Sequence, residues 1–304
     1  MKSFVPGRAV LAACALAMLL ATSACGSTPG SAPSAAPPQS LKVNQQLYRD
    51  LPFAIRHRGT LRVITDASYA PASSFAPDGR TIIGFEPDLG VALGKILGIK
   101  VVFLNTDFAE LSAMVEAGRA DMIMSAVTDT GDREKRLDFV SYFLAGTSLV
   151  VQRGNPEGIS DLASLCGLKV TVETGTVQAD LMARQQSQCG DRPMHIIAEP
   201  TNDDALLQLR TGRAAALPMD FPPADNLTTQ PRTRANYQLA STTQYEPGLY
   251  GIGFPKHQMA LRDTVHTALA QLITSGAYLS VLKKWNVASG AVTRTSINAA
   301  GTGS

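Results

Sequence analysis

The sequence lacks most of the patterns that mark an enzyme or a metalloprotein. Its 304 residues include only four cysteines and four histidines, and the histidines are not paired at helical or zinc-finger spacing. The catalytic patterns G-x-S-x-G and H-E-x-x-H do not occur either. We therefore expect no metal site and no cofactor, and we expect that the chain is not an enzyme.

The chain also lacks a strong excess of either charge. Lys and Arg number 27 against 25 Asp and Glu, a formal net charge of +2. The first 24 residues hold two of the cations, Lys2 and Arg8, and no acid, so their removal lowers this charge to 0. Binding to nucleic acid relies on an excess of positive charge, and we expect no nucleic-acid partner.

The apolar run near the start of the chain is too short to span a bilayer, which needs about 20 residues. This run, Ala9 to Ala21, is followed by small residues up to Cys25, an order typical of a secretory signal. Thr22-Ser23-Ala24-Cys25 resembles the lipobox of bacterial lipoproteins, whereas Cys14 also has a lipobox-like context but almost no apolar run before it. The pattern predicts a signal peptide over residues 1–24 and a lipid on Cys25, with simple cleavage and release as the alternative.

A flexible tether and lead-in are predicted over residues 25–56. From Ser27 to Ser40 the chain is mostly Ser, Pro, Ala and Gly, a composition that cannot bury a core. We expect an extracytoplasmic protein anchored to the cell membrane through the lipid on Cys25.

Two cysteines remain once Cys14 and Cys25 are set aside. Cys166 and Cys189 form an isolated pair in a chain that is expected to reach an oxidising compartment. A metal site would need more ligands than this pair offers. We therefore predict a disulfide between them, which would contribute about 3 kcal/mol by loop closure.

Strand and helix patterns alternate along the body of the chain in two successive series. Such alternation predicts parallel sheets covered by helices, an α/β fold. The predicted strands cover residues 61–65, 101–104, 121–127, 147–152, 168–172, 194–198, 214–219 and 250–255. The predicted helices cover residues 85–98, 108–118, 159–165, 176–188, 202–211 and 260–285.

Polar residues stand at the carboxyl ends of the predicted strands, where α/β sheets bind their ligands. They are Asp66 and Tyr69 in the first series, residues 125–133 later in that series, and residues 174–178 and Asp220 in the second series. Because both series contribute such groups, the pattern predicts a cleft between two lobes.

At these residues the sequence resembles the amino-acid-type extracellular solute-binding proteins of ABC importers, bacterial solute-binding protein family 3. The resemblance runs from about Leu61 to Val287 and follows the family's order. Its motifs are TDASYAP (65–71), GFEPDLGVALGKILG (84–98), FAELSAMVEAGRADMIMSAVTDTGDREKRLDFVSYF (108–143), LASLCGLKVTVETGTVQ (162–178), LQLRTGRAAALPMD (207–220), and a closing GIGFPK…LAQLITSGAYLSVLKKWNV.

The resemblance implies a two-lobed periplasmic-binding-protein fold of type II, with two doubly wound sheets joined by a two-strand hinge. The first lobe is then built from both ends of the body, residues 57–149 and 250–288, and the second lobe from residues 150–249. Residues 289–304 turn small and polar, and we expect them to form a loose tail.

The resemblance also implies how an amino acid would be held. Arg133 stands in the first turn of a predicted helix, where a cation is unfavourable unless an anion lies beside it. The family pattern assigns that anion to the ligand's α-carboxylate, gripped by the guanidinium of Arg133 and by the backbone N–H groups of Thr128 and Thr176. Asp220 would bind the α-ammonium with help from Ser125, and an ordinary turn aspartate is the alternative for Asp220.

Other positions are implied to surround the ligand's side chain. Tyr69 and Phe108 match the rings that sandwich it, although each is alternatively a core aromatic. Asp66 matches a position that often touches the ligand's distal group. The residues expected to line the same pocket are Glu173, Thr174 and Gln178.

The function implied by the resemblance is capture of a polar amino acid or related zwitterion and its delivery to an ABC permease in the membrane, by a chain that is expected to be a monomer. A sensor that reports ligand binding to a membrane receptor shares every binding residue and is an alternative. A dehydratase-type enzyme on the same scaffold is a further alternative. It would need a general acid or base, and Glu173 is the only candidate, with no visible partner.

Overall fold

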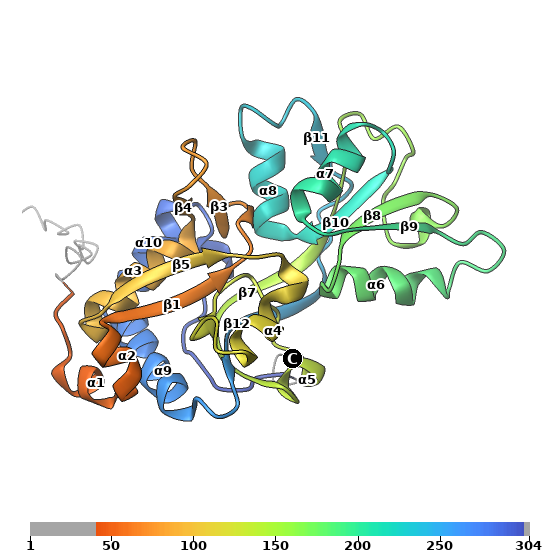
Figure 1. The fold of residues 1–304 in the computed structure, drawn as a ribbon. Helices are drawn as coiled ribbons and strands as arrows, with labels where there is room; N and C mark the ends of the chain where they lie inside the picture. Colours follow the sequence, from red (N-terminus) through yellow and green to blue (C-terminus); the bar gives the residue numbers. More distant parts are fainter. Residues whose placement is uncertain (1–40, 301–304) are drawn as a thin grey trace, which may run out of the picture. The chain divides into compact units, whose positions relative to one another are not determined.

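A nine-stranded sheet forms the centre of the protein in the computed structural model, which describes residues 41–300 (Figure 1). Its strands follow the order β5-β1-β6-β12-β7-β10-β8-β9, and β11 pairs with β7 beside this path. The strands are β1 (Thr60–Thr65), β5 (Lys100–Asn105), β6 (Met122–Ile123), β7 (Leu137–Gln152), β8 (Lys169–Glu173), β9 (His195–Glu199), β10 (Ala216–Asp220), β11 (Tyr237–Leu239) and β12 (Tyr245–Pro255). The predicted signal peptide, Cys25 and the tether up to residue 40 lie outside the described residues.

The two halves of the sheet have parallel strands, and the two long strands between them are antiparallel. In one half β1 pairs in parallel with β5 and β6, and in the other half β8 pairs in parallel with β9 and β10. Between the halves, β12 runs antiparallel to both β6 and β7, and β7 runs antiparallel to β10. The predicted α/β fold with two lobes joined by two strands is confirmed, with the hydrogen bonding continuous through the joining strands.

Helices cover both halves of the sheet. The half that contains β1 carries α3, α9 and α10, which pack against one another, and the half that contains β8 carries α6, α7 and α8 (Figure 1). The helices are α1 (Gln45–Asp50), α2 (Phe53–Arg58), α3 (Phe85–Leu97), α4 (Leu111–Glu116), α5 (Gly131–Glu134), α6 (Val177–Gln186), α7 (Asn202–Arg210), α8 (Phe221–Thr229), α9 (Met259–Thr274) and α10 (Ala277–Lys284). Short 3-10 turns are η1 (Phe108–Glu110), η2 (Ala163–Leu165) and η3 (Ala288–Gly290), and β2 (Ser68–Tyr69), β3 (Ser73–Phe75) and β4 (Ile82–Ile83) form a small separate sheet.

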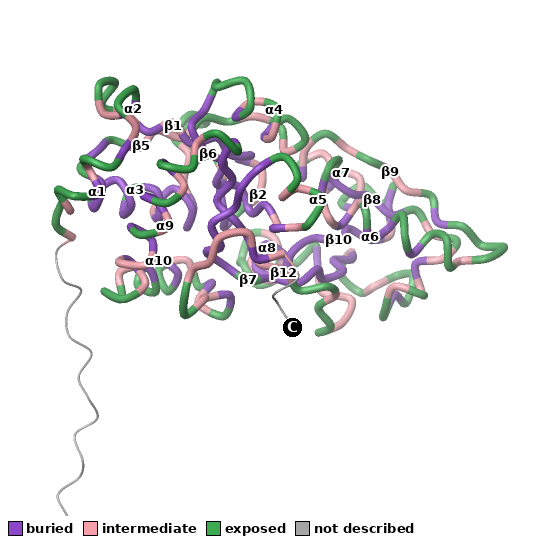
Figure 2. Tube along the Cα trace, turned by 90° about the horizontal axis from the view of Figure 1, so that it is seen from below, coloured by how far each residue is buried: buried purple, intermediate pink, exposed green. Residues whose placement is uncertain are grey.

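Separate hydrophobic clusters fill the two halves, which we call lobe 1 (around β1) and lobe 2 (around β8). The buried residues in Figure 2 follow the central strands and the inner faces of the helices. Along β7 the packing changes from lobe 1 at Ala145 to lobe 2 at Leu149, and along β12 it changes between Tyr245 and Tyr250. These exchanges support our proposal that the chain crosses between lobes near 149/150 and 249/250.

The last described residues differ from the expected loose tail, whose residues 301–304 lie outside the described part of the chain. Residues 291–300 lie along β7, where Ile297 bridges Val140 and the side chain of Asn298 accepts a hydrogen bond from the backbone N–H of Phe139 at 2.8 Å. Ser296 and Ser141 also share backbone and side-chain hydrogen bonds. The small polar composition suits this role, because such side chains reach the strand's backbone and hydroxyl groups.

The lead-in and the last long helix also differ from expectation. Residues 45–58, expected to belong to the tether region or to precede the first strand, form α1 and α2, and Leu47, Leu51 and Ile55 are buried in lobe 1. The predicted helix over 260–285 is broken at Gly276, whose φ of +76° is favoured by glycine. The break separates α9 from α10.

The predicted disulfide is confirmed. Cys166 and Cys189 are bonded, with their Cα atoms 5.3 Å apart, and they join the loop after η2 to the region after α6. Within residues 41–300 no single helix is long and apolar enough to cross a membrane, and α9 with α10 meets that test only as a pair bent by 77°.

Candidate functional site

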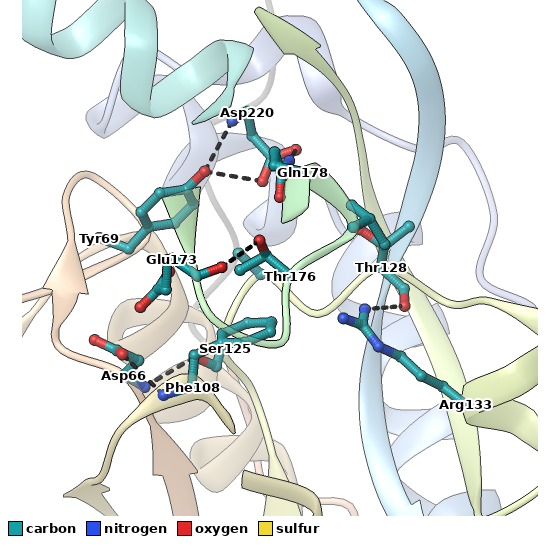
Figure 3. A pocket seen from close by; sticks show the side chains of 12 residues that line it. Asp66, Tyr69, Phe108, Ser125, Thr128, Arg133, Glu173, Thr176, Gln178 and Asp220 are labelled. Atoms are coloured by element: carbon teal, nitrogen blue, oxygen red, sulfur yellow. Dashed lines mark hydrogen bonds between the residues drawn. The ribbon is translucent and has the colours of Figure 1, made fainter. Parts of the chain in front are cut away.

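A cavity lies between the carboxyl ends of strands from both lobes (Figure 3). Asp66 follows β1, Ser125 follows β6, Glu173 ends β8 and Asp220 ends β10, so the strand-end prediction places the cavity correctly. The lining residues are Asp66, Tyr69, Phe108, Ser125, Ala126, Thr128, Arg133, Glu173, Thr176, Val177, Gln178 and Asp220. Nine of the ten predicted ligand-binding residues are in this set, and the exception is Thr174.

Thr174 is the predicted lining residue that the structure places elsewhere. Its side chain is exposed, and its hydroxyl donates a hydrogen bond to the backbone carbonyl of Glu199 at 3.0 Å. Successive side chains of an extended segment point to opposite sides. Because Glu173 points into the cavity, Thr174 points away from it.

Arg133 reaches the cavity from α5, a single turn whose N-cap is Thr130. Its guanidinium donates to the backbone carbonyl of Thr128 at 2.7 Å and, across the cleft, to the carbonyl of Gly175 at 3.0 Å. The same group lies 5.6 Å from the ring centre of Phe108, within cation–π range. Burial lowers the pKa of Arg133, nearby aspartates raise it, and the group keeps its charge.

Asp220 lies on another side of the cavity, between a tyrosine from lobe 1 and a glutamine from lobe 2. The hydroxyl of Tyr69 donates to one carboxylate oxygen at 3.0 Å, and the amide of Gln178 donates to the other at 3.0 Å. The backbone N–H of Asp220 donates back to the Tyr69 hydroxyl at 2.8 Å. Burial raises the pKa of Asp220 to about 6, while the hydrogen bonds from Tyr69 and Gln178 and the charge of Arg133 oppose that rise.

The sequence after Asp220 explains why its carboxylate faces the cavity. Asp220 is the N-cap of α8, a position whose side chain normally accepts from the N–H groups of the second and third helical residues. Here those residues are Pro222 and Pro223, which have no N–H. Asp220 accordingly makes no side-chain cap, which argues against the alternative of an ordinary turn aspartate.

Backbone donors complete the cavity wall at the two predicted positions. In the part of the chain from 41 to 300, the backbone N–H groups of Thr128 and Thr176 meet no acceptor. Thr176 is the N-cap of α6, where its side chain accepts from the N–H of Ala179. Gly175 before it has a φ of +81°, which favours glycine, and this turn aims the start of α6 at the cavity.

Two carboxyl groups face each other at the remaining side of the cavity. Asp66 accepts from the backbone N–H groups of Ser68 at 2.8 Å and Phe108 at 3.0 Å. Glu173 accepts from the backbone N–H of Asn202 at 3.1 Å, and its carboxyl group points toward Asp66 (Figure 3). Burial and the neighbouring Asp66 raise the pKa of Glu173 to about 9.

A residue that sequence reasoning missed holds the cavity floor in place. Glu86, fully buried at the start of α3, accepts from the backbone N–H of Ala126 at 2.6 Å, from the hydroxyl of Tyr142, and from the hydroxyl of Ser73 at 2.8 Å. Ala126 lines the cavity with a φ of +49°. An acid in the first turn of a helix is common, so no local pattern in the sequence indicates this role.

The described residues include no group of three or more His, Cys, Asp or Glu side chains placed to hold a metal ion. The cavity instead presents one guanidinium, backbone N–H donors and three carboxyl groups. This arrangement suits a small ligand that carries both an anionic and a cationic group.

Comparison with known proteins decides the family. Residues 61–288 match the bacterial extracellular solute-binding proteins, family 3. The chain belongs to this family. It is therefore a solute-binding protein rather than an enzyme, from a family of extracellular binding proteins.

Named relatives of this solute-binding protein match about three quarters or more of its chain. The arginine-binding protein ArgT of Corynebacterium glutamicum is 29% identical over 252 residues, which cover 82% of this chain and 81% of that protein. The L-cystine-binding protein TcyJ of Escherichia coli is 29% identical over 234 residues, covering 76% and 84%.

Solved structures show the same fold. An ancestral arginine-binding protein bound to arginine is 30% identical with a TM-score of 0.69, covering 75% of this chain and 98% of that chain. The ancestral amino acid-binding protein AncCDT-1, a precursor of cyclohexadienyl dehydratase, is also 30% identical with a TM-score of 0.69, covering 76% and 97%.

Proposed function

We propose that this solute-binding protein captures an amino acid between its two lobes and delivers it to an ABC permease. The observation that carries the proposal is the cavity between the lobes, with the guanidinium of Arg133 on one side and the carboxylate of Asp220 on another. A zwitterionic ligand offers one group to each. The names of the relatives, which bind arginine and cystine, agree with this ligand class.

The α-carboxylate of the ligand belongs beside Arg133 because no protein acid occupies that place. The guanidinium bonds only to neutral backbone carbonyls, and the described residues include no ion pair to it. The unpaired N–H groups of Thr128 and Thr176 line the same cavity. Charge-assisted hydrogen bonds from these three donors would hold a carboxylate in a fixed orientation.

The α-ammonium belongs beside Asp220. This carboxylate is buried, and its partners Tyr69 and Gln178 are neutral donors rather than cations. An ammonium group here would favour the ionised form of Asp220 and lower its pKa from about 6. Contacts with Arg133 in lobe 1 and Asp220 in lobe 2 would make ligand binding and lobe closure a single event.

Anchoring and delivery complete the proposal. A lipid on Cys25 would hold the protein at the membrane, and the tether would let the closed form reach a permease. The same binding residues would serve a sensor of ligand concentration. Co-purification with a permease or with a receptor from the native membrane distinguishes the two partners.

A thermal-shift panel of the twenty L-amino acids tests ligand binding. A ligand at 100 times its Kd adds about 2.7 kcal/mol of stability, which for a domain of this size corresponds to a rise in Tm of roughly 5–10 °C. We expect at least one amino acid to give such a rise. If no amino acid or related zwitterion shifts the Tm, the proposed function is wrong.

The variant Arg133→Lys tests the site itself. Lysine keeps the charge but cannot form the bidentate hydrogen bonds that a guanidinium makes with a carboxylate. We expect the affinity for the bound amino acid to fall by roughly 10- to 100-fold. The matched control is Arg136→Lys, because Arg136 is exposed and pairs with Glu116 away from the cavity. Equal affinity in the two variants would remove Arg133 from the carboxylate site.

A further inference from the structure

Asp66 and Glu173 form an acidic pair that the recognition of an α-carboxylate and an α-ammonium does not use. Asp66 comes from lobe 1 and Glu173 from lobe 2, and their exposed fractions are 4% and 7%. Figure 3 shows the two carboxyl groups close together on the side of the cavity away from Arg133. Asp203, at the start of α7, adds a further carboxyl group, and burial together with the charges of Asp66 and Asp204 raises its pKa.

The protein supplies no cation to this pair. Within residues 41–300, Arg133 is the only cationic side chain that lines the cavity, and neither Asp66 nor Glu173 takes part in an ion pair. Buried carboxylates are normally paired with a cation or share a proton, because an isolated buried charge is costly. The missing partner is therefore a proton or a cation from the ligand.

Below its pKa of about 9, Glu173 carries a proton beside Asp66, and a cationic group of the ligand would take the place of this proton. Two backbone N–H groups hold both oxygens of Asp66, so this carboxylate is fixed in position and orientation. One backbone N–H, from Asn202, holds one oxygen of Glu173, and the other oxygen faces Asp66 without an N–H donor. A planar guanidinium or a tetrahedral ammonium group between them would donate hydrogen bonds to the carboxylate oxygens of Asp66 and Glu173 at once, and so contact both lobes.

We infer that Asp66 and Glu173 are specificity-determining residues that select an amino acid with a cationic side chain. This inference rests on the proposed function, because it assumes that Arg133 and Asp220 hold the α-carboxylate and the α-ammonium. The side chain of the ligand then extends past Phe108 and Tyr69 toward the acidic pair. A neutral side chain of the same length leaves the pair without a cation.

A pair of ligands with nearly the same shape tests the inference. L-arginine and L-citrulline differ in a guanidinium against a neutral urea group at the end of the side chain. We expect isothermal titration of the mature protein to show arginine binding roughly 10- to 100-fold more tightly than citrulline, the range for a charge-assisted contact. In Glu173→Gln and in Asp66→Asn this ratio falls toward one.

The chain offers a matched control on the neighbouring strand. Glu199 is the register partner of Glu173 on β9, but its side chain bonds to Gln208 and does not line the cavity. Glu199→Gln removes the same charge from the same sheet, and we expect it to keep the arginine-to-citrulline ratio of the wild type. Far-UV circular dichroism confirms that each variant is folded.

The outcomes separate the two proposals. Two results would contradict selection of a cationic side chain: equal affinity of the wild type for arginine and citrulline, or tighter binding of a neutral amino acid than of any cationic one. Neither result would contradict the proposal that the protein binds an amino acid. If Glu173→Gln and Asp66→Asn both keep the wild-type ratio, these carboxylates do not determine specificity. If no amino acid binds at all, the proposed function fails, and this inference fails with it.

Discussion

Arg133 and Asp220 carry opposite charges at one cavity, and the groups that bond to them are neutral. Backbone carbonyls accept from Arg133, while a hydroxyl and an amide donate to Asp220. Burying charges beside neutral partners costs stability, and a zwitterion would supply the missing counter-charges. At the residue scale, we therefore expect the cavity to cost the fold stability until a ligand supplies the counter-charges.

The pH dependence of stability reports on Glu173. Its pKa is about 9 in the folded protein and 4.5 ordinarily, so between these values the folded state binds more protons than the unfolded chain. The free energy of unfolding therefore falls as the pH rises through this window. We expect a fall of at most about 3 kcal/mol between pH 7 and pH 9, measured by urea denaturation without ligand.

The groups around Glu173 define the control for that measurement. Asp66, Asp203 and Tyr69 surround its carboxyl group, and the raised pKa of Asp220, about 6, lies below the chosen window. Glu173→Gln removes the titrating group, so this variant is expected to keep nearly the same stability at pH 7 and pH 9. A variant that loses as much stability as the wild type would assign the pH dependence to another residue.

The family motifs predicted individual site residues that hydrophobic and polar patterns alone do not indicate. Arg133 and Asp220 came from motif positions, and Pro222 and Pro223 add a local reason why Asp220 is free to face the cavity. Glu86 was missed because its burial depends on Ala126, which is distant in sequence. Thr174 was predicted to line the cavity because the motif places it next to Glu173, but a motif does not determine in which direction a side chain points.

At the element scale, the strands and helices with regular apolar patterns were predicted, and those shaped by tertiary contacts were not. β8, α6 and α7 lie within a few residues of their predicted ranges. β7 is far longer than predicted, because its first half is buried on both faces against lobe 1 and shows no alternation. α8 was missed because its prolines, favourable in a first helical turn, also occur in loops.

The Cys166–Cys189 disulfide lies in lobe 2, and neither cysteine lines the cavity. The bond spans a sequence separation of 23 residues, for which loop closure predicts about 3 kcal/mol. We expect replacement of both cysteines by serine to lower the Tm by roughly 6–12 °C in scanning calorimetry. The affinity for the bound amino acid should stay within about threefold, because neither cysteine lines the cavity.

Two results would contradict the role of this disulfide. An unchanged Tm would mean that the bond does not restrict the unfolded chain as loop closure requires. A large loss of affinity at an unchanged Tm would mean that the bond positions the start of α6, where Thr176 lies. The wild type in the presence of reductant provides an independent comparison.

At the scale of the whole described chain, hydrogen bonds already join the two lobes across the cleft. Tyr69 bonds to Asp220, Arg133 bonds to Gly175, and Asn202 donates to the backbone and side chain of Ser68 at 3.2 Å. Each of these pairs links lobe 1 to lobe 2 beside the cavity. A ligand that contacts both lobes would add to these bonds and shift the population toward the closed arrangement.

Calorimetric titration of the mature protein with L-arginine and with agmatine, the same molecule without its α-carboxylate, tests the central claim most directly. If Arg133, Thr128 and Thr176 bind the α-carboxylate, agmatine should bind at least about 100-fold more weakly than arginine, since several charge-assisted hydrogen bonds are lost. Agmatine binding within about threefold of arginine would show that no carboxylate is held between the lobes, and it would contradict the proposed site.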